Sequence, residues 1–123
     1  SDLAKVHTIV VDRRPTVKAR PRVTKKGYAY TPKKTLEAED IVSAAWAEQV
    51  GEIFSGPVEV TIRYSPTETI LTVMESPHDA GVLKGDLDNY VKLTLDALNK
   101  VAWEDDKQVV RISAVKVDHD DKD

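Results

Sequence analysis

The alternation of apolar and polar residues predicts several short strands along the chain. Residues 5–11 carry many β-branched side chains and alternate before running apolar, which is typical of a strand. Residues 58–62 alternate Val and Ile with polar side chains, which predicts a half-buried strand. Residues 70–75 follow a Ser-Pro-Thr turn and predict another strand, so these two are candidates for a hairpin.

Two segments have the three- and four-residue apolar spacing of helices. In residues 35–50, Thr35 is placed to cap the first turn and Trp46 is expected to anchor the core. Residues 87–101 give the clearest helical pattern, with an apolar stripe on one face. Residues 109–117 then alternate with apolar side chains on both faces, which predicts a strand inside a sheet.

The order strand, basic loop, helix, strand, strand, helix, strand predicts an α/β fold of the α+β class. We expect a small mixed β-sheet of about four strands with two helices. The length of 123 residues fits one domain over residues 1–123, with residues 1–4 and 118–123 expected to fray. No apolar run approaches the roughly 18 residues that span a bilayer, so no membrane partner is expected.

The absence of cysteine excludes disulfides, thiolate zinc sites and cysteine nucleophiles. No Walker or Rossmann glycine pattern is present, so no organic cofactor is expected. No signal peptide opens the chain, and a cytoplasmic setting is therefore the default expectation.

The charge is divided unevenly along the chain, although the net charge is only −3. Residues 1–36 hold ten Lys or Arg against two Asp, a net +8, and the other 87 residues hold eight basic against 19 acidic residues, a net −11. This division predicts a basic surface for a polyanion, although such charges also simply solubilise loops. Tyr28 and Tyr30 lie among the cations, where they either stack on bases or form one face of a short strand.

The candidate chemistry lies at the start of the second predicted helix. Asp86 and Asp88 flank its first residue, and Lys92 lies one turn beyond Asp88 on the same face. Asp105 and Asp106 follow the helix in a short connection. Hard divalent ions such as Mg²⁺ and Mn²⁺ take oxygen ligands and commonly share them with a substrate phosphate. The pattern therefore predicts a metal site that cleaves phosphodiester bonds.

Each of these residues also has an ordinary structural interpretation. Aspartates near a helix start cap backbone donors, Asp88 and Lys92 fit an i,i+4 ion pair worth about 0.3–0.5 kcal/mol, and an Asp-Asp pair fits a turn. Capping needs one carboxylate rather than two, and a second acidic pair nearby adds only repulsion unless a cation is bound. A calcium-binding EF-hand loop is excluded because Val91 and Ala97 stand where it needs Gly and Glu.

Residues 85–99, which read Gly-Asp-Leu-Asp-Asn-Tyr-Val-Lys-Leu-Thr-Leu-Asp-Ala-Leu-Asn, together with the Glu-Asp-Asp-Lys-Gln-Val-Val block at 104–110, resemble the RusA family of Holliday-junction resolvases. This family is often carried by phages and prophages. The resemblance is specific over residues 85–117 and looser over Arg20-Pro21-Arg22-Val23-Thr24. The chain departs from many members before Asp86, where Lys84 stands in place of a basic run.

The resemblance implies a homodimer whose two active sites make paired cuts in a four-way DNA junction. It also implies a Mg²⁺-dependent endodeoxyribonuclease, with Mn²⁺ as a substitute, in the cytoplasm of a bacterial or phage-infected cell. Asp86, Asp88 and Asp106 would bind the metal, with Asp105 as an alternative ligand, and Lys92 would be the essential lysine. Two other hypotheses are a nuclease acting on flaps or forks in phage DNA processing and a non-catalytic DNA-binding module.

The residues expected to bind DNA phosphates are all basic. Apart from Lys84, they lie in the basic first third of the chain, where salt-dependent contacts would give affinity without reading sequence. The predicted set is Arg20, Arg22, Lys25, Lys26, Lys33, Lys34 and Lys84.

Overall fold

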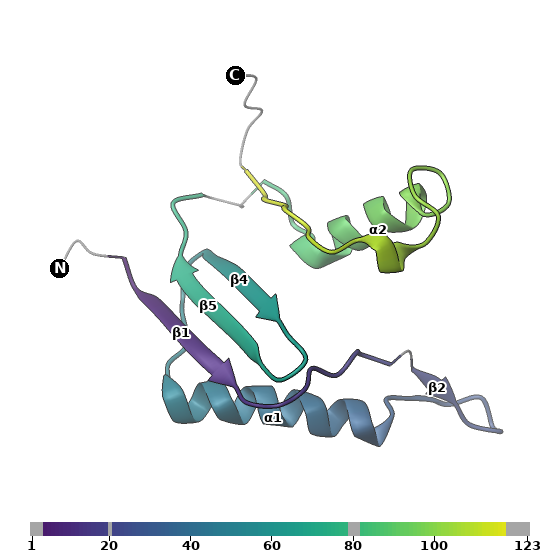
Figure 1. Ribbon diagram of the computed structural model, residues 1–123, viewed down its shortest axis with the longest axis horizontal. Coiled ribbons are helices and arrows are strands. Elements are labelled where there is room, and N and C mark those ends of the chain that lie inside the picture. Colours follow the sequence, from purple (N-terminus) through teal and green to yellow (C-terminus); the bar gives the residue numbers. More distant parts are fainter. Residues whose placement is uncertain (1–3, 20, 79–81, 118–123) are drawn as a thin grey trace. The chain divides into compact units, whose positions relative to one another are not determined.

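The computed structural model describes residues 4–19, 21–78 and 82–117. The chain divides into two compact units, residues 1–76 and residues 77–123. In Figure 1 the sheet and the longer helix α1 belong to the first unit, and the helix α2 belongs to the second. That residues 1–123 form one domain stays a prediction.

The first unit is built on a three-stranded sheet in the order β1-β5-β4. Its strands are β1 (Val6–Val11), β4 (Val58–Tyr64) and β5 (Thr69–Glu75). β5 lies in the middle and pairs antiparallel with both neighbours, with Thr72 opposite both Thr8 and Thr61. The predicted strand at 5–11 and the predicted hairpin of the next two strands are confirmed.

The helix α1 (Lys33–Gln49) packs against β1. Ile9 and Val11 are the buried apolar residues of the described chain. Trp46 makes an edge-on contact with His7, and its indole N–H donates to the carbonyl oxygen of Glu52 at 2.8 Å. The expected role of Trp46 as an anchor between helix and sheet is consistent with these contacts.

The last residue of α1 reaches the outer edge of β1. The Gln49 side-chain amide donates to the Val10 carbonyl oxygen at 2.8 Å, and its oxygen accepts from the Val10 N–H at 3.1 Å. One residue of the strand edge is thereby satisfied by a side chain instead of by another strand.

α1 starts two residues earlier than predicted, and Thr35 is not its cap. Pro32 occupies the N-cap position, and the helix begins at Lys33. Thr35 is buried inside the helix, and its hydroxyl accepts a hydrogen bond from the Ala19 backbone N–H at 3.3 Å. Proline can occupy this position because its ring fixes φ near the observed −56° and it has no N–H to satisfy.

A small hairpin lies within the predicted basic loop. β2 (Arg22–Val23) pairs antiparallel with β3 (Ala29–Tyr30). Gly27 has a φ of +88°, a left-handed conformation that favours glycine, and its N–H donates to the Thr24 carbonyl at 2.9 Å. The loop is thus partly ordered by its own turn.

The second unit contains α2 (Leu87–Leu98) and a short 3-10 helix (Asp106–Gln108). α2 is shorter than the predicted 87–101 because the chain turns at Lys100, which has a φ of +68°. Residues 99–105 form the connection, in which Lys100 N–H donates to the Trp103 carbonyl at 2.7 Å.

The predicted fourth strand at 109–117 is wrong. This segment is not assigned to a strand, and it has no strand pairing within the described residues. Val110 is 94% exposed, which does not fit an interior strand. An apolar alternation shows that a segment suits an extended conformation, but a strand also requires a neighbour to complete its hydrogen bonds.

The α+β class is confirmed, with a three-stranded and a two-stranded antiparallel sheet in place of the expected mixed sheet of about four strands. The ends predicted to fray, apart from Ala4, lie outside the described residues. None of the helices described is both long enough and apolar enough to cross a bilayer.

Candidate catalytic site

Asp86 and Asp88 lie at the N-terminus of α2. Asp86 is the N-cap residue, with φ −69° and ψ 140°, but its side chain makes no capping hydrogen bond. Asp88 lies in the first helical turn. Both residues are exposed, and neither carboxylate has a hydrogen-bond or ion-pair partner among the described residues. The ordinary cap role proposed for such an aspartate is therefore not observed for Asp86.

The backbone before Asp86 is held by two side chains from other positions. The Lys116 ammonium donates to the carbonyl oxygens of Gly85 at 2.8 Å and Leu83 at 3.4 Å. The Tyr90 hydroxyl accepts from the Gly85 N–H at 3.3 Å, and a Cβ at position 85 would meet the Tyr90 ring at 3.0 Å. Sequence reasoning missed Lys116, because no local pattern links it to a turn 31 residues earlier.

Lys92 does not pair with Asp88. Its ammonium lies 3.2 Å from Oδ2 of Asp96, one turn further along α2, and both side chains are largely exposed. The i,i+4 ion pair considered for Asp88 and Lys92 is thus not formed. Because exposed pairs of this kind contribute only about 0–1 kcal/mol, Lys92 can leave Asp96 at little cost.

Asp105 and Asp106 have different surroundings although they are neighbours. Asp105 precedes the 3-10 helix and forms a capping box with Gln108, whose side-chain oxygen accepts from the Asp105 N–H at 2.8 Å. Asp106 is half-buried, and its Oδ1 accepts from the indole N–H of Trp103 at 2.8 Å. Asp105 therefore has a turn-forming role, and Asp106 has a fixed carboxylate.

The oxygen donors of this region suit Mg²⁺ or Mn²⁺, but they do not form a closed cage. Within residues 4–19, 21–78 and 82–117, no three acidic, imidazole or thiol side chains lie close enough together to hold a metal ion. Mg²⁺ is commonly bound through one or two carboxylates, with waters and substrate phosphates as the other ligands. Each aspartate has oxygen donors suited to such a partial site, but the described structure does not bring three of them together, and their assignment as ligands stays a prediction.

The predicted DNA-binding residues that the structure describes are all exposed. Arg22, Lys25 and Lys26 belong to the β2–β3 hairpin and its turn, while Lys33 and Lys34 occupy the first turn of α1. Cations at a helix N-terminus oppose the helix dipole, so an anion bound there would relieve an unfavourable arrangement. Lys84 lies two residues before Asp86, and Arg20 lies outside the described residues.

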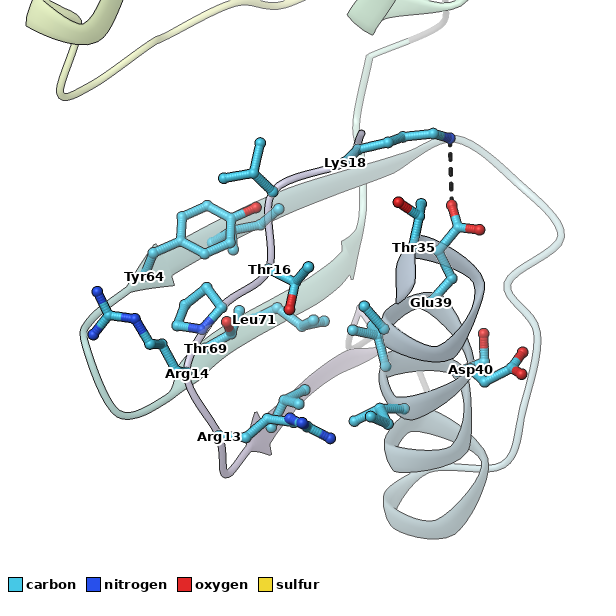
Figure 2. Close-up of a pocket in the computed structure, with 18 residues that line it drawn as sticks. Arg13, Arg14, Thr16, Lys18, Thr35, Glu39, Asp40, Tyr64, Thr69 and Leu71 are labelled. Atoms are coloured by element: carbon cyan, nitrogen blue, oxygen red, sulfur yellow. Dashed lines mark hydrogen bonds and ion pairs between the residues drawn. The ribbon is translucent and has the colours of Figure 1, made fainter. Parts of the chain in front are cut away.

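The first unit also contains a pocket of about 690 Å³, and Figure 2 shows the residues around it. It lies between α1, the β4–β5 hairpin and residues 13–18. Tyr64 and Arg14 are on one side, and Lys18 is on the other, with its ammonium 3.3 Å from Glu39. None of the aspartates predicted to bind metal is among the residues that line this pocket.

The chain matches a known protein family over most of its length. The model of the family described as endodeoxyribonuclease RusA matches residues 12–122, nearly the whole chain. The matched range includes every residue predicted for the metal site and for DNA binding. Comparisons with curated proteins and with solved structures gave no match.

Proposed function

Because this chain belongs to the RusA endodeoxyribonuclease family, we propose that it is a metal-dependent nuclease that resolves Holliday junctions by paired phosphodiester cuts. The observation that carries the proposal is the pair of carboxylates at the start of α2. Asp86 and Asp88 are exposed and unpartnered among the described residues, and the backbone before them is held by Lys116. A carboxylate that binds a cation has to be accessible and free of other partners in this way.

In this proposal Asp86, Asp88 and Asp106 hold Mg²⁺, or Mn²⁺ in its place. The cation supplies positive charge that polarises the scissile phosphate. Asp105 is the weaker candidate for a ligand, because its capping box already engages it with Gln108. The exposed Lys92–Asp96 pair lets Lys92 turn toward a bound phosphate and stabilise the charge that develops there.

The β2–β3 hairpin and the start of α1 are proposed to hold the DNA backbone. Arg22, Lys25 and Lys26 present cations on a short hairpin, and Tyr28 in the same hairpin is 70% exposed. Contacts of this kind position DNA without reading its sequence. Recombination and repair of branched DNA in the cytoplasm of a bacterial or phage-infected cell is the matching biological setting.

A homodimer is proposed because paired cuts in a four-way junction require two active sites. The residues of the apolar row of β4, Val58, Val60, Ile62 and Tyr64, are each exposed, and the last two also line the pocket beside α1. Continuous apolar surface of this kind marks an interaction site more often than free surface. A second copy of the chain is the proposed partner for this row.

The test is a cleavage assay on labelled four-way junction, linear duplex and flap substrates with Mg²⁺, Mn²⁺ or EDTA. We expect paired, metal-dependent junction cuts that Asp88→Asn abolishes, because the amide removes a charged oxygen ligand. Asp40→Asn, an exposed aspartate on α1, is the matched control and should cleave normally. Junction binding without cleavage in every metal would contradict the nuclease proposal. Preferential cutting of the flap would identify flaps, and not four-way junctions, as the substrate.

A further inference from the structure

Trp103 makes a side-chain hydrogen bond to one of the proposed metal ligands. Its indole N–H donates to Oδ1 of Asp106 at 2.8 Å, and both residues are half-buried. The indole N–H is only a donor, and a hydrogen bond from it to a carboxylate is charge-assisted and strongly directional. This bond fixes how the carboxylate is turned.

The backbone around Trp103 is held from both sides. Its carbonyl accepts from the Lys100 N–H at 2.7 Å, and it forms an isolated bridge with Asn99. The Lys100 ammonium reaches past it to the Glu104 carbonyl at 2.9 Å. Lys100 adopts a positive φ, which non-glycine residues keep only where the surrounding contacts outweigh the strain. The indole is thus placed by the turn that ends α2.

The two oxygens of Asp106 consequently have different roles. Oδ1 is occupied by the indole, and no partner of Oδ2 is found within the described part of the chain. We propose that Trp103 is a positioning residue that aims the free oxygen of Asp106 at the divalent cation and thereby sets how tightly the cation is held. This inference rests on the proposed function, because it requires Asp106 to be a metal ligand.

The variant that tests it is Trp103→Phe, which keeps an apolar ring and removes the N–H. Partners that orient a metal ligand typically change metal affinity or activity by roughly 10–100-fold when they are lost. We expect the Mg²⁺ concentration for half-maximal junction cleavage to rise by at least about tenfold. Excess Mg²⁺ should restore most of the rate, and junction binding in EDTA should be unchanged.

Trp46→Phe is the matched control, because it loses an indole hydrogen bond of the same length, 2.8 Å, to a backbone carbonyl in the first unit. If Trp103 has only a packing role, both variants will lose thermal stability and keep the wild-type Mg²⁺ midpoint. That result, obtained while Asp106→Asn is inactive at every Mg²⁺ concentration, overturns the inference and leaves the proposed function standing. Full cleavage by Asp106→Asn would instead remove Asp106 from the proposed site.

A readout independent of cleavage is the indole N–H signal of Trp103 in a nitrogen–proton NMR spectrum, assigned with the help of Trp46→Phe. On titration with Mg²⁺ alone, this signal should shift and saturate in the wild-type protein, and the shift should vanish in Asp106→Asn. The measurement needs no Trp103 variant, so it stands even if Trp103→Phe fails to fold. A signal that does not respond to Mg²⁺ in wild-type protein that cleaves junctions would overturn the inference.

Discussion

Asp105 and Asp106 illustrate how strongly surroundings divide the roles of identical side chains. One forms a capping box with Gln108, and the other accepts an indole hydrogen bond from Trp103. The sequence analysis placed the Asp-Asp pair after α2 but did not choose between its members. The choice depends on which carboxylate the short 3-10 helix uses for its own start, and the three-residue spacing from Asp105 to Gln108, which is that of a capping box, is the local signal that could have made it.

We therefore expect opposite effects from substitutions at these two positions. Asp105→Ala should destabilise the protein by about 0.5–2 kcal/mol, the usual range for loss of a cap, and should leave junction cleavage within a few-fold of wild type. Asp106→Asn should keep the melting temperature nearly unchanged and abolish cleavage. Thermal melts and single-turnover cleavage of both variants check this. If Asp105→Ala is inactive and Asp106→Asn is active, Asp105 and not Asp106 is the metal ligand.

At the scale of elements, the sequence correctly predicted the helices and strands whose apolar residues recur at a regular spacing. β1, the β4–β5 hairpin and both helices follow directly from apolar spacing of two or of three to four residues. The segment 109–117 failed because the same alternation also suits extended chain without a neighbour. The start of α1 was misplaced because Thr35 was taken as the cap, whereas Pro32 occupies the N-cap position.

The β2–β3 hairpin is the element expected to contribute most to non-specific DNA affinity. Replacing Lys25 and Lys26 together with Gln should weaken binding to junction and duplex alike, since both would lose phosphate contacts. Each phosphate contact contributes about 0.9 to the slope of log affinity against log salt, so the slope should fall by roughly two units.

Fluorescence anisotropy at several salt concentrations measures that slope. The control is a Lys5→Gln and Lys107→Gln double variant, which makes the same change in charge outside the hairpin. If the control lowers the slope as much as the hairpin variant does, general charge rather than the hairpin governs the affinity.

At the scale of the whole molecule, the apolar row of β4 and the requirement for two cuts lead to the same expectation of a dimer. Light scattering at micromolar concentration should give twice the chain mass. Val60→Lys places a charge in the middle of the row, at a side chain that is 53% exposed, and should give monomers that nick junctions instead of resolving them.

Thr61→Lys adds the same charge on the opposite face of β4 and should remain dimeric. A wild-type protein that stays monomeric while it makes paired cuts would contradict the dimer. Dimers of Val60→Lys would place the contact on another surface.

The amide of Gln49 has a consequence for how copies of this chain can associate. It occupies the N–H and the carbonyl of Val10, so a strand that pairs with β1 at Val10 must first displace it. The opposite edge of the sheet is formed by β4. If copies of the chain join edge to edge, pairing through β4 leaves the two Gln49 hydrogen bonds intact, whereas pairing along β1 at Val10 breaks them.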